Sequence, residues 1–464
     1  MAGLPDQVRH DAASLYQFVC SIVDLCESRN PAAAYLSSSE RFFDYLVELG
    51  RATKDYVRKF PGGRTQPAEY LDLRDEIAVL RAGWQFLHAL VRPALESDTL
   101  HLPSALIQGL ITRFREIPRY SKTDFTIFHT DEFNYLTVRL NVFKRNADRI
   151  AGLVHGPTFP EQLGLIGIPY SQSSSLFMNC LIPHEMGHYV FADAGLGAKF
   201  RPAIEQQLVN NLGSQLSPLD RIAVTDALTK WSEELFCDLF AVRLVGFSYS
   251  LAFVELFDTS KALDENGKLS PVRSLGMAEF DEYPPDLFRV KQQAAVLIKD
   301  KWWHELVKVD SHYVNLLQAA EQMKDTDFGF PFSSQADPGK ILESFLTVVP
   351  QVFSELDAVT AALKSGFEAW NKTSTDVETY LEHGVVPSSL LEKKGKLNFV
   401  RPDLVGLLNS SYKFYVESLD RLISHIKDAD ANDVGTRSVW AGKVQTWTAK
   451  AIEDVSLLEG KGIV

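Results

Sequence analysis

The feature that most constrains this 464-residue chain is a pair of histidines in the segment His184-Glu185-Met186-Gly187-His188. Residues four apart on a helix lie one above the other on the same face. Two imidazoles at that spacing can bind one metal ion, and zinc is the usual occupant of such a site. We therefore expect a helix across this segment whose histidine face meets a third ligand from elsewhere in the chain.

Glu185 directly follows the first histidine and completes the pattern H-E-x-x-H. In zinc hydrolases with this pattern, the glutamate acts as general base toward the metal-bound water. A chain of this length and composition would contain the pattern by chance in roughly one or two cases per hundred. The pattern therefore predicts a hydrolytic zinc site with His184 and His188 as ligands, but it needs support from a third ligand.

The third ligand is sought downstream, because zinc hydrolases usually hold their metal through three protein groups and leave a fourth position for water. Glu234 and Asp238 are four residues apart in a segment with helical periodicity. We assign Glu234 to the metal. We assign Asp238 to a hydrogen bond from the outer nitrogen of a ligand histidine, which fixes the tautomer. Glu233 is the competing ligand, but no acid follows it at this spacing.

The helix that carries these acids has a clear start at Ser217, with Pro218 in its first turn and Asp220 three residues after the serine. Apolar residues then recur without a proline, which predicts a helix from about Pro218 to Val245. The alternative interpretation of the acids is a solvated face. A carboxylate among large apolar neighbours is costly to bury without a partner, and a metal with its histidines would be that partner.

The H-E-x-x-H segment followed by Glu234-x-x-x-Asp238 resembles the gluzincin metallopeptidases. Ala241, three residues after the aspartate, makes the second motif similar to that of the M48 peptidase family, which reads E-x-x-x-D-x-x-A. The resemblance covers roughly residues 160 to 290. It implies a zincin-like core with one zinc ion on the two histidines and Glu234.

Peptidases of this family often carry a third element, a His-Pro pair followed a few residues later by arginine. In this chain the pair reads Tyr283-Pro284 and the arginine is Arg289, so a tyrosine replaces the histidine. A gluzincin also needs a group that stabilises the oxyanion, usually a Tyr, His or Arg from outside the metal helix. The resemblance favours Tyr283 and Arg289, because it brings their segment near the site. The other candidates are Tyr170, His304 and His312.

The function that the resemblance implies is hydrolysis of peptide bonds by a zinc-dependent peptidase. Glu185 would take the proton of the attacking water and later pass it to the leaving amine. Two alternatives use the same residues. One is a zinc hydrolase of a non-peptide amide or ester, since only the cleft distinguishes the substrates. The other is an inactive zinc-binding scaffold or regulatory protein, against which the intact Glu185 argues.

Composition restricts the compartment and the partners. A hydrophobic content of 45% with 11% aromatic residues is typical of a folded globular protein. The net charge of −13 argues against nucleic-acid binding and against adhesion to anionic membranes.

No stretch reads as a signal peptide or a membrane span. The four cysteines form no C-x-x-C pair, which fits a reducing compartment, and we interpret Cys237 as a small core residue. We therefore expect a cytoplasmic protein that acts on a protein or peptide substrate, without membrane insertion.

Periodicity predicts a mainly α fold with a small β-sheet, divided into three regions. These are an N-terminal helical region (residues 1–118), the gluzincin-type metallopeptidase core (119–310) and a C-terminal helical region (311–464). Segments 124–129 and 135–140 are β-prone. The flanking helical regions have three roles open to them: to enclose the cleft, to recruit a regulatory protein partner or to keep the enzyme latent.

Two further expectations concern the surroundings of the metal motif. Leu163–Tyr170 reads as a strand, and Pro169 argues for an edge position or a strand end. Zincins usually bind peptides along such an edge by strand addition. Because Pro183 directly precedes the first metal histidine, the metal helix either begins there or a longer helix kinks there. Gly195 and Gly197 are expected to end the metal helix.

Overall fold

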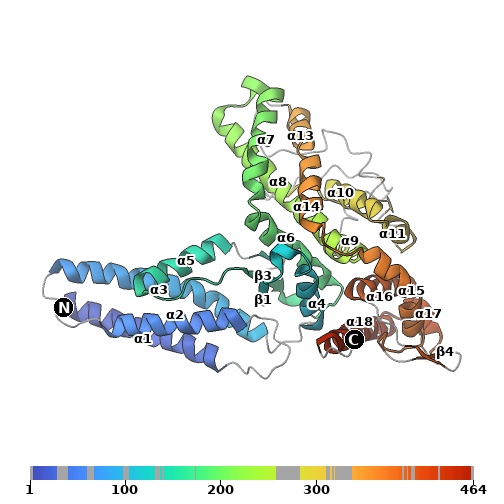
Figure 1. The fold of residues 1–464 in the computed structure, drawn as a ribbon, viewed down its shortest axis with the longest axis horizontal. Helices are drawn as coiled ribbons and strands as arrows, with labels where there is room; N and C mark the ends of the chain where they lie inside the picture. The colour runs from blue at the N-terminus through green and yellow to red at the C-terminus, as the bar shows by residue number, and fades with distance from the viewer. Residues whose placement is uncertain are drawn as a thin grey trace. The chain divides into compact units, whose positions relative to one another are not determined.

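The computed structural model describes residues 4–28, 40–59, 67–97, 104–130, 136–137, 140–172, 174–257, 283–309, 314–315, 318, 337–388, 391–393, 396–398, 403–426 and 429–460. Within these residues the fold is mainly α with little β-structure, as the sequence predicts (Figure 1). The chain forms two compact units. Unit 1 comprises Met1–Ser104 and Lys122–Ser174, and unit 2 comprises Ala105–Ser121 and Ser175–Val464.

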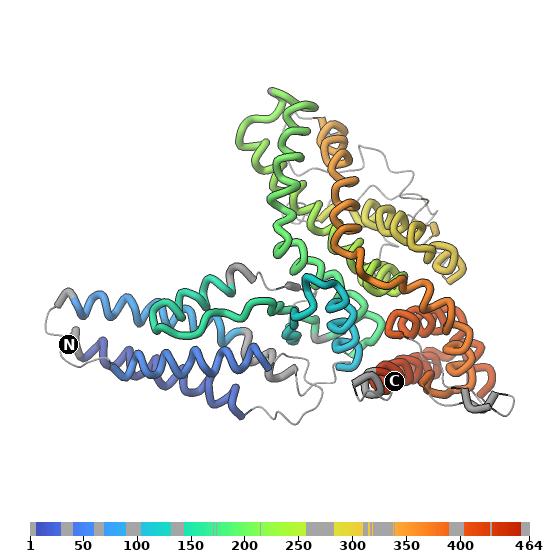
Figure 2. Tube along the Cα trace, in the orientation of Figure 1, coloured from blue at the N-terminus to red at the C-terminus, as the bar shows by residue number. Residues whose placement is uncertain are grey.

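Unit 1 is a group of long helices that pack on a small sheet. Its helices are α1 (Leu4–Glu27), α2 (Glu40–Arg58), α3 (Pro67–Ser97) and α5 (Leu140–Val154). Helix α1 packs against α2 and α3, and α5 packs against the same two helices (Figure 2). Their apolar stripes meet in one core, where the indole N–H of Trp84 donates to Thr53 Oγ1 at 3.1 Å. The helices expected near the N-terminus are therefore confirmed.

The sheet of unit 1 has the strand order β1-β3-β2. Its strands are β1 (Asp124–Thr130), β2 (Leu136–Thr137) and β3 (Leu163–Pro169). Strand β1 runs parallel to β3 with Ile127 opposite Ile166, and β2 runs antiparallel to β3. The expected edge position of β3 is therefore wrong. The alternative, a strand end at Pro169, is confirmed, and it suits a residue without an N–H to donate.

Unit 2 is built from many helices around the long helix α8. The helices are α4 (Ser104–Phe114), α6 (Ile182–Asp193), α7 (Leu196–Leu212), α8 (Pro218–Val245), α9 (Phe247–Phe257), α10 (Asp286–Lys299), α11 (Trp303–Val309), α13 (Pro338–Leu346), α14 (Val349–Thr360), α15 (Gly366–Glu382), α16 (Leu404–Glu417), α17 (Leu419–Ser424) and α18 (Val434–Gly460). Helix α8 packs against α6, α7, α10 and α14. A short hairpin of β4 (Leu391–Lys393) and β5 (Lys396–Asn398) also belongs to this unit. Among the described residues, no helix has the length and apolarity that a membrane crossing requires.

These two units differ from the three regions that the sequence predicts. The β-prone segments were expected within the core from residue 119, but helix α3 packs on β1 and the sheet belongs to unit 1. Nearly all of α4 belongs instead to unit 2, where the ring of Phe114 contacts those of Tyr189 and Phe240. The C-terminal helices belong to the same unit as α6 and α8, because α14 and α16 pack directly on α8.

Helix α8 begins and ends where the sequence predicts. Ser217 Oγ accepts a hydrogen bond from the backbone N–H of Asp220 at 3.2 Å. The helix ends at Val245, and Gly246 follows with a φ of 73°, a conformation that favours glycine. Asn409 of α16 then links α8 to α9: its side chain donates to Val245 O at 2.8 Å and accepts from Ser248 N at 3.0 Å. The start of α9 is thereby fixed to the end of α8.

The metal helix α6 begins at Ile182 with Pro183 in its first turn. The first of the two alternatives for this proline is therefore confirmed. A short 3-10 helix, η3 (Met178–Leu181), precedes it. Gly195 follows the end of α6 with a φ of 65°, as expected. Gly197 lies inside α7, so its expected role is wrong, because the turn at Gly195 already separates the two helices.

Candidate metal centre

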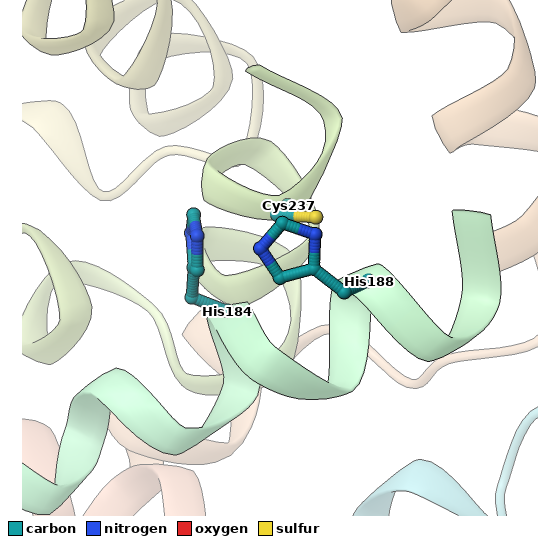
Figure 3. A group of neighbouring side chains, drawn as sticks. All are labelled: His184, His188 and Cys237. Carbon is teal, nitrogen blue, oxygen red and sulfur yellow. The ribbon is translucent and has the colours of Figure 1, made fainter. Parts of the chain in front are cut away.

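Helices α6 and α8 approach each other closely at Gly187. A Cβ atom at this position would lie 2.8 Å from the Cα of Cys237, a distance that real side chains do not tolerate. Glycine therefore permits the close crossing of the two helices. His184 and His188 flank this glycine on α6, and their rings both project toward α8 (Figure 3).

The two histidines meet Glu234 of α8. His184 Nε2 lies 3.2 Å from Glu234 Oε2, and His188 Nε2 lies 3.6 Å from Glu234 Oε1. Nitrogen and oxygen ligands in tetrahedral zinc sites are bound at 2.0–2.2 Å, so their mutual distances are about 3.3 Å. Both histidine–glutamate separations are close to that value. The residues that the sequence predicts as ligands are therefore brought together.

The outer nitrogens of both histidines face carboxylates. His184 Nδ1 lies 2.9 Å from Asp238 Oδ1, as the spacing of Glu234 and Asp238 predicts. His188 Nδ1 lies 3.0 Å from Glu233 Oε1. A carboxylate at Nδ1 keeps the proton of a neutral imidazole on that atom and leaves the Nε2 lone pair for a ligand bond. Both histidines thus present Nε2 to the carboxylate of Glu234.

The role of Glu233 was missed by sequence reasoning, which considered it only as a competing ligand. Consecutive helical residues point about 100° apart, so Glu233 and Glu234 leave α8 in different directions and meet different atoms of the histidines. Glu234 reaches both Nε2 atoms, and Glu233 reaches the outer nitrogen of His188. A signal was present in the pair of adjacent acids, but its interpretation required the crossing geometry of α6 and α8.

Asp238 is the centre of a fully buried polar network. Its carboxylate accepts hydrogen bonds from Arg289 Nε at 2.7 Å and Arg289 Nη2 at 2.8 Å, and from the hydroxyl of Tyr249. Burial raises the pKa of Asp238, but Arg289 and His184 outweigh burial and hold that pKa well below its usual range. The carboxylate therefore stays ionised beside His184.

The segment of Tyr283 and Arg289 reaches the site, as the resemblance implies. Arg289 Nη2 also lies 3.6 Å from Glu234 Oε2. The guanidinium carbon of Arg289 lies 5.7 Å from the centre of the Tyr283 ring, and Tyr283 is 40% exposed. The buried Arg289 is thus engaged by the site's carboxylates, and an oxyanion-stabilising role stays a prediction for both residues. Of the other candidates, His304 is exposed on α11, and His312 and the side chain of Tyr170 lie outside the described residues.

The electrostatics of the centre favour positive charge at the histidines. Burial lowers the pKa of His184, but Asp238 and Glu234 outweigh burial and raise that pKa to about 10. Burial likewise opposes ionisation of His188, but Glu234 and Glu233 hold its pKa above the ordinary value. For Glu234, burial raises the pKa, but the two histidines hold it below its usual range. A proton or a metal cation can supply the positive charge that these groups favour.

Glu185 is buried on α6 directly after His184, with 5% of its surface exposed. Its negative charge contributes to the raised pKa of His188, so its carboxylate belongs to the same electrostatic centre. The expected position beside the histidine pair is therefore observed. Its action as general base stays a prediction.

Cys237 is a second candidate metal ligand from α8, beside Glu234. Its sulfur lies within 4.8 Å of ligand atoms of both histidines, so His184, His188 and Cys237 form a largely buried group that could hold a metal ion (Figure 3). The expectation of a buried small residue is confirmed, but sequence reasoning did not place its sulfur at the histidines. Burial, together with Glu234 and Glu233, raises the pKa of this thiol well above its usual range. That shift disfavours the thiolate that binds metals.

Comparison of the chain with protein-family models, with curated proteins and with solved structures found no match.

Proposed function

We propose that this protein is a zinc-dependent peptidase, with His184, His188 and Glu234 as metal ligands and Glu185 as general base. One observation carries the proposal: each histidine has a carboxylate at Nδ1, and both turn Nε2 toward Glu234. Metal-ligating histidines almost always give their second nitrogen to a carboxylate, a carbonyl or water. Two such pairs that converge on one acid support a metal site at this place.

Glu234 is the proposed third ligand in preference to Cys237. The Glu234 oxygens lie 3.2 Å and 3.6 Å from the two Nε2 atoms, close to the separation within a tetrahedral zinc site. The sulfur of Cys237 also lies within 4.8 Å of ligand atoms of both histidines. Burial and the neighbouring carboxylates, however, raise the pKa of its thiol well above the usual range, which disfavours the thiolate that binds metals. Cys237 also lies at the crossing with Gly187, where its backbone and side chain serve the packing of the two helices.

The chemistry follows from the arrangement of these groups. Bound zinc would supply a Lewis acid that polarises a carbonyl and lowers the pKa of water. Glu185 would accept a proton from the attacking water and deliver it to the leaving amine. Asp238 and Glu233 would hold the histidines as Nδ1–H tautomers, and Arg289 would keep Asp238 ionised. A peptide substrate is proposed because of the likeness of the two motifs to the gluzincins.

We expect this enzyme to act in the cytoplasm. All four cysteines are free, which is consistent with the reducing cytoplasm. The net charge of −13 argues against non-specific binding of nucleic acid. Access to the centre would have to be restricted in that compartment, which supports a regulatory role for the flanking helices.

The test is a proteome-wide comparison of protein N-termini in native host cells that express either the wild type or Glu185→Gln. The substitution removes the base and retains all three proposed ligands, so both proteins should contain one zinc ion by elemental analysis. We expect N-termini that occur only with the wild type. Identical sets of N-termini with full zinc content would argue against an active peptidase and leave a latent enzyme that lacks its trigger, a non-peptide hydrolase or a zinc-binding scaffold.

A further inference from the structure

Tyr249 reaches the centre from α9, a helix that carries none of the motif residues. Its side chain is fully buried, and its hydroxyl donates a hydrogen bond to Asp238 Oδ1. The same hydroxyl oxygen lies 3.2 Å from His184 Nδ1. The phenol ring is nearly parallel to the imidazole ring of His184, with an angle of 5° between the planes. Tyr249 therefore contacts both members of the buried carboxylate–histidine pair.

The hydrogen-bonding capacity of these groups dictates where the protons lie. An ionised carboxylate only accepts, so the single proton of the Tyr249 hydroxyl must go to Asp238. The phenol oxygen then faces His184 Nδ1 with lone pairs, as does Asp238 Oδ1 at 2.9 Å. Both oxygens therefore require the proton of a neutral imidazole on Nδ1. This leaves the lone pair on Nε2, the atom that faces Glu234.

The position of the Tyr249 hydroxyl is fixed by structure outside the centre. The backbone of Ser248 donates to Asn409 Oδ1 at 3.0 Å, and Asn409 also bonds to the end of α8 at Val245. Tyr249 follows directly on this junction. Because the junction joins α8, α9 and α16, the hydroxyl is held in place relative to Asp238, which lies on α8. The contact is therefore preorganised rather than dependent on a mobile surface side chain.

We propose that Tyr249 is a positioning residue whose hydroxyl orients Asp238 and fixes the Nδ1–H tautomer of His184, thereby setting the metal affinity of the centre. The inference rests on the proposed function, because it takes His184 as a metal ligand. Arg289 balances the charge of Asp238, whereas Tyr249 is neutral and contributes orientation alone.

The test compares Tyr249→Phe with Tyr412→Phe in the full chain. Tyr412 is a matched control in the same unit: it is buried, and its hydroxyl donates to Glu255 Oε2 at 2.8 Å, outside the centre. The dissociation constant for zinc is measured by competition with a chromophoric chelator. The unfolding midpoint of each metal-free protein is measured in parallel, and visible spectra of the cobalt forms report the geometry of the metal.

We expect Tyr249→Phe to weaken zinc binding by about 10- to 100-fold and to shift the cobalt spectrum, because partners of ligand histidines typically have effects of this size. Tyr412→Phe should retain the wild-type affinity and spectrum. Wild-type affinity in Tyr249→Phe overturns the inference and leaves the proposed function intact. Equal losses in both variants also overturn it, since they indicate general loss of packing. A wild-type protein that binds no zinc overturns the proposed function together with the inference.

Discussion

The two histidines of the centre have the same kind of partner in different surroundings. Asp238, the partner of His184, has a fully buried side chain and is bonded to Arg289 and Tyr249. Glu233, the partner of His188, has a side chain that is 22% exposed and lies 3.8 Å from Lys230. Charges interact strongly in the interior and weakly where water screens them. Similar carboxylate contacts at the two histidines therefore need not contribute equally to stability or to metal affinity.

The difference also concerns rigidity. His184 lies on α6, and Asp238 of α8 and Tyr249 of α9 contact its Nδ1 atom. A fourth helix, α10, supplies Arg289, which holds Asp238. The groups around His188 Nδ1 come from α6 and α8 alone among the described contacts. We therefore expect substitutions around His184 and its partner Asp238 to lower both stability and metal affinity. Substitutions around His188 and its partner Glu233 should have smaller effects, so the asymmetry is directly testable.

The largest expected effect comes from Asp238→Asn. The substitution keeps the shape of the side chain but leaves the buried guanidinium of Arg289 without its main counter-charge. Breaking a buried pair in this way costs about 3–5 kcal/mol. Urea unfolding of the metal-free protein should show that loss, and zinc affinity should fall with it. A loss below about 1 kcal/mol would remove the basis of the comparison.

Gly187→Ala should have the next largest effect, and it acts on both sides of the centre. The added methyl group would lie 2.8 Å from Cys237 Cα, so α6 and α8 must separate. Overpacking of this kind typically costs about 1–3 kcal/mol, and zinc affinity should fall because both histidines move relative to Glu234.

Gly442→Ala in α18 is the matched control, because a methyl group there meets nothing within 4 Å. In a helix interior this change should stabilise the protein by about 0.5–1 kcal/mol. Thermal unfolding of both variants, with and without zinc, provides the measurement. If Gly187→Ala behaves like Gly442→Ala, the close helix crossing does not govern the centre.

The pH dependence of the metal-free protein should report the His184 side of the comparison. The pKa of His184 is raised from 6.5 to about 10 in the folded state. Its contribution to stability is therefore complete below pH 6.5 and is lost as pH rises through about 10. The urea midpoint of unfolding of the zinc-free protein should fall as pH rises across this range. The midpoint of the zinc-bound protein should stay constant, because the metal takes the place of the protons on the histidines. A flat profile without zinc would contradict the strong coupling of His184 to Asp238.

Glu233→Gln should have the smallest effect. Partly exposed pairs contribute about 0–1 kcal/mol, so the unfolding free energy should change within that range. Zinc affinity should fall by no more than about tenfold, the lower end for partners of ligand histidines. Calorimetric zinc titration of this variant beside Asp238→Asn measures the asymmetry itself. Equal losses of affinity in the two variants would show that burial does not distinguish the two sides.

Local signals in the sequence were sufficient to predict most helices and many residues of the candidate site. The start of α8 follows from the Ser217 cap, and its length follows from apolar residues that recur without a proline. The histidine pair and the spacing of Glu234 and Asp238 each follow from helical geometry. These features depend on residues within a few turns of one another, which is why the sequence alone predicts them.

The features that escaped prediction depend on how distant helices meet. Tyr249 lies in a mostly apolar helix, so nothing in the sequence distinguishes its hydroxyl from an ordinary core tyrosine. The contact of Glu233 with His188 and the nearness of Cys237 follow from the crossing at Gly187. Periodicity identifies the buried face of a helix, but it does not identify the helix that covers this face.

X-ray absorption spectroscopy at the zinc edge of the purified protein tests the central claim most directly. With His184, His188 and Glu234 as ligands, the first shell should contain only nitrogen and oxygen at about 2.0–2.2 Å. Cys237→Ala should give the same spectrum, whereas Glu234→Ala should lose the zinc. A sulfur scatterer at about 2.3 Å in the wild type, or a protein that binds no zinc, would contradict the account.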